Sequence, residues 1–181
     1  FDIDNKAIEK FRQNLAGQNF RIKVASSAEA AVAGADIITT VTADKKQATI
    51  LSDNMIGNGV HINGIGGDCP GKTELQKSIV ARANVFVELE EQSRIEGEIQ
   101  QMDKDFPVTE FWQVLKGDAP GRKSQDEITL FDSVGFALED FSYLRFINDK
   151  IQNNEFADYY EEIDLITAPD DPRDLFSFLN C

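Results

Sequence analysis

Four apolar runs rich in β-branched residues recur along the chain, and they constrain its fold more than any other feature. Runs that are apolar at successive positions are typical of strands buried on both faces, as in a parallel sheet. Predicted helices separate them, so the sequence predicts an α/β fold with a doubly wound parallel sheet. The runs are ADIITTV (35–41), GVHINGI (59–65), NVFVEL (84–89) and EITLFDSV (127–134).

Two weaker strand signals come before these runs. Phe1–Ile3 has the apolar–acid–apolar pattern of a strand's last residues, and FRIKV at 20–24 is a short strand candidate. Between them, Asp4 is a predicted N-cap and Gly17 a predicted end of a helix. Because a domain that opens on the end of a strand lacks what precedes it, we expect the chain to be a fragment.

Helical patterns occupy the segments between the strands. The capping box Ser26-x-x-Glu29 predicts a short alanine-rich helix. An acidic, proline-containing segment begins near Asn153 and marks the one plausible domain boundary. Further helices are predicted at 53–56, 74–83, 90–101, 109–116 and 136–151.

The charge and the cysteine content exclude several classes of function. There are 18 Lys and Arg residues against 32 Asp and Glu, a net charge of −14, which would repel a phosphate backbone and argues against nucleic acid as a partner. No apolar run approaches the ~20 residues that span a bilayer, so we expect no membrane partner. Two cysteines and no export signal predict a reducing, cytoplasmic location. A single histidine, His61, argues against zinc chemistry.

Three features fall where predicted strands end, which is where open parallel sheets bind ligands. They are Asp2, the hydroxyl-rich segment 39–42 and the loop GGDCPGK at 66–72. Asp2 fits a bond to a ribose hydroxyl, and it fits a cap of the following helix equally well. The threonines are also ordinary strand-end residues, and the loop is also compatible with a plain turn. Three glycines, a proline, an acid and a lysine within seven residues favour a functional loop.

The letters of this loop match a phosphate-binding P-loop, but its chemistry does not. Residues 66–73 read GGDCPGKT, which satisfies the spacing G-x-x-x-x-G-K-T. Pro70 removes a backbone N–H that would be needed to bind phosphate, and Asp68 places a negative charge within the loop. We therefore reject a nucleotide-hydrolysing site.

Other notable residues have simpler interpretations. No histidine flanks Cys69, which favours a structural thiol over a nucleophile. His61 lies inside a predicted strand and is expected in the core. Trp112 is expected in the core or at a subunit contact. A solvated helix face is the expected place of most of the acids Glu88, Glu90, Glu91, Glu96 and Glu98.

The longest motifs resemble a known family. They are HINGIGGDCPGKTELQ, then RANVFVELEEQSRIEGEIQQMDKDFPVTEFWQVLKG, then EITLFDSVGFALEDFSYLRF. These segments closely resemble the cyclodeaminase branch of the ornithine cyclodeaminase/μ-crystallin family, NAD(P)-dependent enzymes that handle imines. The likeness runs from FDID through DIITTVTADK to DDPRDLFS, essentially the whole chain. GGDCPGKTEL with RIEGEIQQ is more specific than a lone glycine motif.

The resemblance implies a homodimeric protein whose subunit has two domains. One is a dimerisation and substrate domain, and the other is a Rossmann domain that binds NAD. Residues 1–135 would be a partial Rossmann domain without its first strand and glycine-rich turn. Residues 136–181 would be a C-terminal helix and acidic tail that return to the absent domain, which supplies the groups for the substrate carboxylate.

The resemblance also implies roles for individual residues. Asp68 matches the catalytic carboxylate, which would move protons as a general acid and base. Asp2 matches the acid that binds the ribose, and its charge would oppose a 2′-phosphate. Cofactor binding is expected at Asp2, Thr42, Gly66, Gly67, Lys72 and Ser133, and substrate binding at Val134.

The activity implied is conversion of L-ornithine to L-proline with release of ammonia, in ornithine catabolism and proline synthesis. Two alternatives remain: a related NAD(P)-dependent amino-acid dehydrogenase or ketimine reductase, and a non-catalytic, μ-crystallin-like binding protein. Asp68, expected to be buried, favours an enzyme together with Lys72, since a scaffold would not need a buried acid there. Without a central first strand we expect the isolated chain to be inactive.

Overall fold

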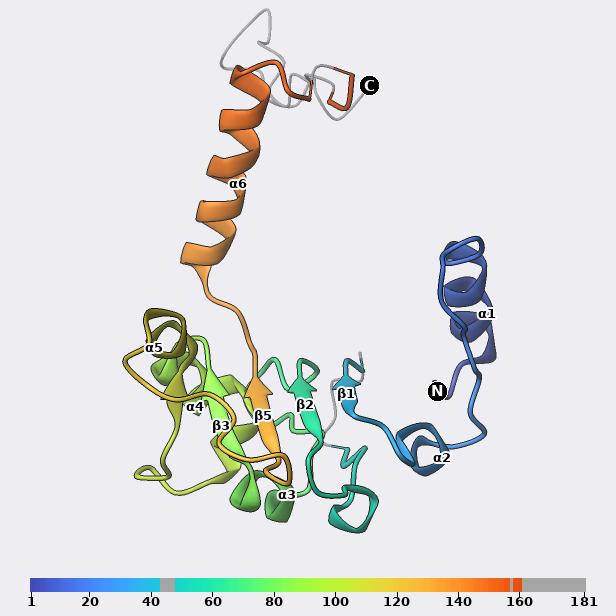
Figure 1. The fold of residues 1–181 in the computed structure, drawn as a ribbon, viewed down its shortest axis with the longest axis vertical. Helices are drawn as coiled ribbons and strands as arrows, with labels where there is room; N and C mark the ends of the chain where they lie inside the picture. The colour runs from blue at the N-terminus through green and yellow to red at the C-terminus, as the bar shows by residue number, and fades with distance from the viewer. Residues whose placement is uncertain (43–47, 157, 161–181) are drawn as a thin grey trace, which may run out of the picture. The chain divides into compact units, whose positions relative to one another are not determined.

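The parallel sheet predicted from the apolar runs is present (Figure 1). A computed structural model describes residues 1–42, 48–156 and 158–160. Its five strands are β1 (Ile37–Thr40), β2 (His61–Gly64), β3 (Asn84–Val87), β4 (Thr109–Glu110) and β5 (Thr129–Asp132). The order is β1-β2-β5-β3-β4, and every neighbouring pair is parallel. The four predicted runs are confirmed as strands, and their carboxyl ends share one edge of the sheet.

Two strand predictions and the start of one helix prediction are wrong. Neither Phe1–Ile3 nor 20–24 forms a strand. An extended segment keeps strand geometry only where a neighbour satisfies its N–H and C=O groups, and neither segment pairs with a strand in the described residues. Conversely, β4 occupies two residues that were predicted to begin a helix. They pair with Phe86 and Val87 of β3 and are too few to show a periodic pattern.

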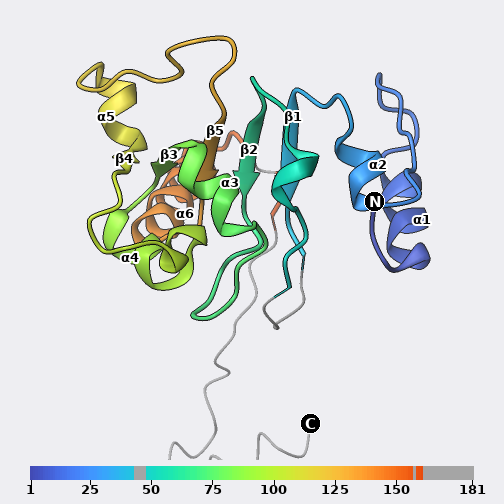
Figure 2. The ribbon, with the colours of Figure 1, turned by 90° about the horizontal axis from the view of Figure 1, so that it is seen from below.

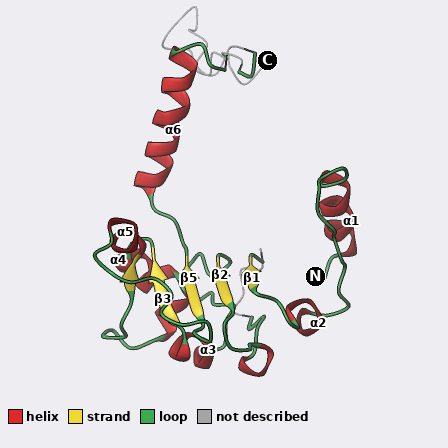
Figure 3. Ribbon diagram, in the orientation of Figure 1, coloured by secondary structure: helices red, strands yellow, loops and turns green. Residues whose placement is uncertain are grey.

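Helices and short 3₁₀ turns connect the strands (Figure 3). Asp4 caps the first helix, accepting a hydrogen bond from Lys6 N as predicted. Ser27, not Ser26, caps the second, because its side chain accepts from Ala30 N. The predicted helix 90–101 is divided at Gly97. The helices and turns that precede β5 are α1 (Asn5–Asn14), α2 (Ala28–Val32), η1 (Asp53–Met55), α3 (Lys77–Arg82), α4 (Glu90–Glu96), η2 (Glu98–Gln101) and α5 (Phe111–Lys116).

One face of the sheet forms the core. Ile38, Ile62 and Leu130 lie on adjacent strands and point to this face, each nearly or fully buried. Ile79 and Val80 of α3 pack against them, and Figure 2 shows α3 beside the sheet. The burial of these side chains gives the sheet its main apolar stabilisation.

The other face of the sheet carries more polar residues. His61 lies there, half-buried, and its ring nitrogens contact Thr129 Oγ1 at 2.7 Å and Asn63 Oδ1 at 3.1 Å. Successive residues of a strand face opposite sides of the sheet, so His61 lies on the face away from the core. The prediction that His61 is a core residue is therefore wrong. Trp112 is 46% exposed, so of its two predicted places the core is wrong, and a subunit contact stays a prediction.

The chain divides into two compact units, Phe1–Ala137 and Leu138–Cys181. The described part of the second unit is mainly α6 (Ala137–Gln152), as predicted from its sequence. Several apolar side chains of α6 are exposed, among them Phe141 and Leu144. Within the described residues, every helix is too short or too polar to cross a membrane.

Candidate functional site

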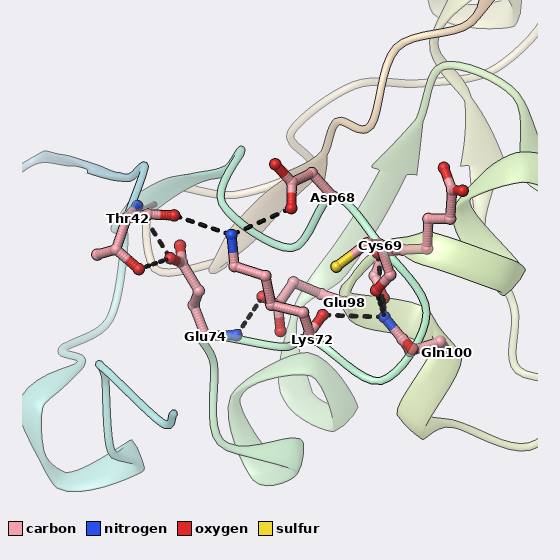
Figure 4. A network of polar contacts seen from close by, with 9 residues as sticks. Thr42, Asp68, Cys69, Lys72, Glu74, Glu98 and Gln100 are labelled. Atoms are coloured by element: carbon pink, nitrogen blue, oxygen red, sulfur yellow. Dashed lines mark hydrogen bonds and ion pairs between the residues drawn. The ribbon is translucent and has the colours of Figure 1, made fainter. Parts of the chain in front are cut away.

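The glycine-rich loop follows β2 at the carboxyl edge of the sheet. Its first residues are held beside β1, because Ile65 N and Gly66 N both donate to Thr40 O at 3.0 Å. Lys72 turns back toward β1, and its Nζ donates to Thr42 O at 2.9 Å and to Asp68 Oδ1 at 3.0 Å (Figure 4). The structure therefore brings together three of the predicted site residues: Thr42, Asp68 and Lys72.

The two members of the Asp68–Lys72 ion pair differ sharply in exposure. The Lys72 side chain is 4% exposed, while the Asp68 side chain is 58% exposed. The prediction that Asp68 is buried is wrong, because the loop carries it outward at the edge of the sheet. One carboxylate oxygen is held by the buried ammonium, and the second remains available to a molecule in solution. That arrangement suits an acid that exchanges protons with a ligand.

Asp2 and Thr42 line one crevice at the end of β1. The crevice has a volume of about 160 Å³ and is also lined by Thr39 and Thr40. Asp2 accepts a hydrogen bond from Asp4 N at 2.8 Å, whereas the cap of α1 is Asp4 itself. The position of Asp2 thus fits both a turn-stabilising role and contact with a ligand in the crevice.

Gly66 and Gly67 have a reason to be glycine that the sequence did not reveal. A Cβ atom on Gly66 would lie 2.1 Å from a carboxylate oxygen of Glu74. On Gly67 it would lie 2.9 Å from Glu98 Oε1. Both glycines therefore make room for buried acids behind the loop, and their contact with a cofactor stays a prediction.

Ser133 and Val134 form a turn after β5, and Glu88 holds it. Ser133 Oγ donates to Glu88 Oε1 at 2.5 Å, while Val134 N and Gly135 N donate to Glu88 Oε2 at 3.1 and 2.6 Å. Glu88 is half-buried, so its predicted place on a solvated helix face is wrong. The turn lies at the same edge as the glycine-rich loop, because Asp132 at the end of β5 pairs with Gly64 of β2.

Three further acids are buried behind the loop, and sequence reasoning missed all of them as site residues. Glu74 is 1% exposed, and Glu98 and Asp132 are 0% exposed. Burial raises the pKa of Glu98 to about 7, with the charges of Asp132 and Glu74 adding to the effect. Burial likewise raises the pKa of Asp132 to about 6, and Glu88 adds to it. The one available signal was the glycine before Glu98, which breaks the helical pattern.

The last features of the site are its possible metal ligands and its thiol. They contain no group of three or more His, Cys, Asp or Glu side chains placed to hold a metal ion. Cys69 is a free, half-buried thiol. Its structural role stays a prediction, and Cys181 lies outside the described residues.

The first comparison with known proteins is by sequence. A family model described as "Ornithine cyclodeaminase/mu-crystallin family" matches residues 1–155. Ornithine cyclodeaminase from Agrobacterium fabrum is 57% identical over 179 residues, which cover 99% of this chain and 50% of that protein. The chain thus spans about half the length of the curated relatives it matches.

Solved structures share the fold. An archaeal alanine dehydrogenase dimer with bound NAD has a TM-score of 0.75 and 29% identity, covering 91% of this chain and 51% of that chain. A lysine cyclodeaminase, solved for its recognition of L-lysine, L-ornithine and L-2,4-diaminobutyric acid, has a TM-score of 0.76 and 30% identity. That match covers 97% of this chain and 50% of that chain. The sheet is therefore of the Rossmann type, and the alanine dehydrogenase that shares it has bound NAD.

Proposed function

The chain belongs to the ornithine cyclodeaminase/mu-crystallin family, and we propose that the whole protein converts L-ornithine to L-proline and ammonia with NAD. One observation carries the proposal: identity to an ornithine cyclodeaminase far exceeds identity to the alanine dehydrogenase of the same fold. The geometry agrees, because an exposed carboxylate anchored by a buried lysine lies at the ligand-binding edge of the sheet.

The residues present fit the adenosine end of NAD. Asp2 and Thr42 share a crevice at the end of β1, where a carboxylate can accept hydrogen bonds from both ribose hydroxyls. Its negative charge would repel a 2′-phosphate, which favours NAD over NADP. When bound, NAD would supply the redox chemistry, accepting a hydride from the substrate and returning it to the cyclic imine.

In the proposed reaction, Asp68 moves the protons. The δ-amine must lose a proton before it attacks the carbon of the imine, and the departing nitrogen must gain one before it leaves as ammonia. Asp68 Oδ2, the oxygen that Lys72 does not hold, can take the first proton and give the second. Lys72 fixes the direction of the carboxylate through Asp68 Oδ1 and Thr42 O.

A second candidate is a related NAD(P)-dependent amino-acid dehydrogenase or ketimine reductase. The likeness to the archaeal alanine dehydrogenase with bound NAD favours it. The two activities leave different cofactor balances. A cyclodeaminase returns its hydride and accumulates no NADH, whereas a dehydrogenase forms one NADH for each amino acid oxidised.

The deciding experiment supplies the whole protein with L-ornithine and NAD⁺. We expect proline and ammonia in equal amounts and no lasting rise in absorbance from NADH. NADH formed in step with ammonia would instead establish the dehydrogenase. Binding of NAD without any turnover would support a non-catalytic protein of the μ-crystallin type.

Substitution of the proposed catalytic acid is the sharpest test of mechanism. Asp68→Asn should lower kcat by about 10²–10⁴-fold, because the amide cannot exchange protons, and leave NAD affinity nearly unchanged. Asp105→Asn, which changes an exposed acid outside the site, is the matched control. Unchanged turnover in Asp68→Asn would remove Asp68 from the mechanism.

The assembly and the minimal active unit are proposals too. We expect the whole protein to be a homodimer, as the archaeal alanine dehydrogenase is described, which light scattering of the purified protein would test. We expect the 181 residues alone to form no proline, because the relatives are about twice as long. Proline formation by this chain would contradict that expectation.

A further inference from the structure

We propose that Asp132, Glu98 and Glu74 are positioning residues: a line of buried carboxylates that runs from the end of β5 to Thr42 and holds the Asp68–Lys72 loop in place. None of the three forms a hydrogen bond or ion pair with Asp68 in the structure, so each would act through the backbone. Their effect on turnover rests on the proposed function, whereas their effect on the loop does not.

The line starts at Asp132, the last residue of β5. Its two oxygens accept from Glu98 N at 2.7 Å and Ile99 N at 3.0 Å, which are the first amides of η2. A Cβ on Gly97 would lie 2.5 Å from Asp132 Oδ2, so the approach requires glycine there. The strand end thereby sets the position of η2.

Glu98 continues the line from η2 to the segment after the loop. Its oxygens accept from Glu74 N at 2.6 Å and Leu75 N at 3.1 Å, and Gln101 Nε2 adds a third bond at 3.2 Å. Gly67 packs directly over this carboxylate. The start of the glycine-rich loop and the segment just after it therefore both contact the Glu98 carboxylate.

Glu74 completes the line at the end of β1. Its Oε1 accepts from Thr42 N at 2.9 Å and also from Thr42 Oγ1. Lys72 holds the same residue from the other side, at Thr42 O. Thr42 is thus fixed at its N–H, its hydroxyl and its carbonyl, and Figure 4 shows these contacts converging.

A side branch from η2 holds the middle of the loop. Gln100 Nε2 donates to Lys72 O at 2.9 Å and to Cys69 O at 3.3 Å, and Gly71 N donates to Gln100 Oε1 at 2.6 Å. The backbone from Cys69 to Lys72, which joins the two members of the ion pair, is therefore bound to η2, which Asp132 holds. A carboxylate is well suited to such work, since its two oxygens can accept from two neighbouring amides at once.

A line of buried acids is an unfavourable way, in free energy, to stabilise a fold. Buried acids contribute little or negative net stability, because burial penalises their charge. Glu74 Oε2, moreover, is buried without a hydrogen-bond partner in the part of the chain that the structure describes. Acids with raised pKa gathered at one ligand-binding edge point to a role in placing the site.

The test uses the whole protein with Glu98→Gln and Glu74→Met, and Glu91→Gln and Glu91→Met as the matched controls. Methionine replaces Glu74 because a glutamine would keep the one oxygen that accepts from Thr42. Glu91 is exposed and lies in the neighbouring α4. We expect amide exchange in the loop to become about tenfold faster in both test variants. Glu98→Gln loses one of the two oxygens that accept from Glu74 N and Leu75 N, and Glu74→Met loses the oxygen that accepts from Thr42. Exchange in the central strands should not become faster and the melting temperature should not fall, and the controls should match the wild type.

Activity gives a second readout. Glu98→Gln should lower kcat by about 10–100-fold with little change in KM for ornithine, the usual pattern when a supporting residue is lost. Glu74→Met should also weaken NAD binding, because it removes the oxygen that holds Thr42. If the whole protein has no activity toward ornithine but loop exchange rises as expected, the proposed function fails and the positioning role stands.

Two results would overturn the proposal. One is unchanged exchange in the loop of either test variant. The other is faster exchange throughout the sheet with a large fall in melting temperature, which would show that the acids hold the fold as a whole. If Glu98→Gln does not fold, Glu74→Met decides by the same two criteria.

Discussion

The covered face of the sheet and its carboxyl edge are both buried, but they are held by different forces. On the face, Ile62 and Leu130 pack among other apolar side chains, and apolar contact has no direction. At the edge, Glu98 and Asp132 accept directed hydrogen bonds from backbone amides. Packing of this kind tolerates small rearrangement, whereas the carboxylates fix atomic positions. The protein thus uses apolar burial where it needs stability and buried acids where it needs placement.

The largest expected effect on stability lies on the covered face. Leu130→Ala should lower the free energy of unfolding by about 2–5 kcal/mol, because it leaves a cavity in a fully buried layer. The loss should be nearly the same at pH 5 and pH 8, since no charge changes. Urea denaturation at both pH values measures it. A loss in the free energy of unfolding that varied strongly with pH would contradict the difference between the covered face and the carboxyl edge.

The edge should respond to pH in a way that the face does not. The pKa of Glu98 is raised from 4.5 to about 7, so the folded state keeps a proton that the unfolded state has already lost. Its contribution is fully present below pH 4.5 and is lost as pH rises through 7. Relative to wild type, Glu98→Gln should therefore gain roughly 3 kcal/mol of stability between pH 4.5 and above pH 7. A constant difference between the two proteins across this range would contradict the assignment.

The smallest expected effect concerns the space that the buried acids occupy. Gly66→Ala should destabilise the protein by about 1–3 kcal/mol, because the new methyl group would overlap the Glu74 carboxylate. Gly57→Ala is the matched control, since a Cβ there meets nothing within 4 Å. Thermal melting compares the two. Equal melting temperatures would mean that Glu74 can move aside, and that the edge is less rigid than the hydrogen bonds indicate.

The sequence predicted the sheet well because its signal is local. The β-branched runs at 35–41 and 127–134 indicate buried strands by their own composition, without information from the rest of the chain. The segment 20–24 has the same local pattern but depends on a neighbouring strand, so its composition could not decide its structure. The two residues of β4 carry no periodic signal at all.

The sequence predicted the residues of the glycine-rich loop and Thr42 as site residues, but not the buried acids behind them. The density of glycines and charges marked Asp68 and Lys72, and the resemblance to the family marked Thr42. Glu98 could not be recognised, because it follows a run of acids that looks like any solvated helix face. Glu98 is buried because Asp132, which lies 34 positions away in the sequence, accepts a hydrogen bond from the Glu98 backbone N–H.

The carboxylate line also bears on the order of events in folding. Its bonds from one element to the next join residues that are 23 to 34 positions apart, and each needs the preceding strand end in place. We expect these contacts to close late, because each acid must wait for the strand end that it joins to be in place. Loosening them should speed unfolding and leave the folding rate nearly unchanged. The edge that holds the candidate site would then be the part of the molecule that opens first and re-forms last.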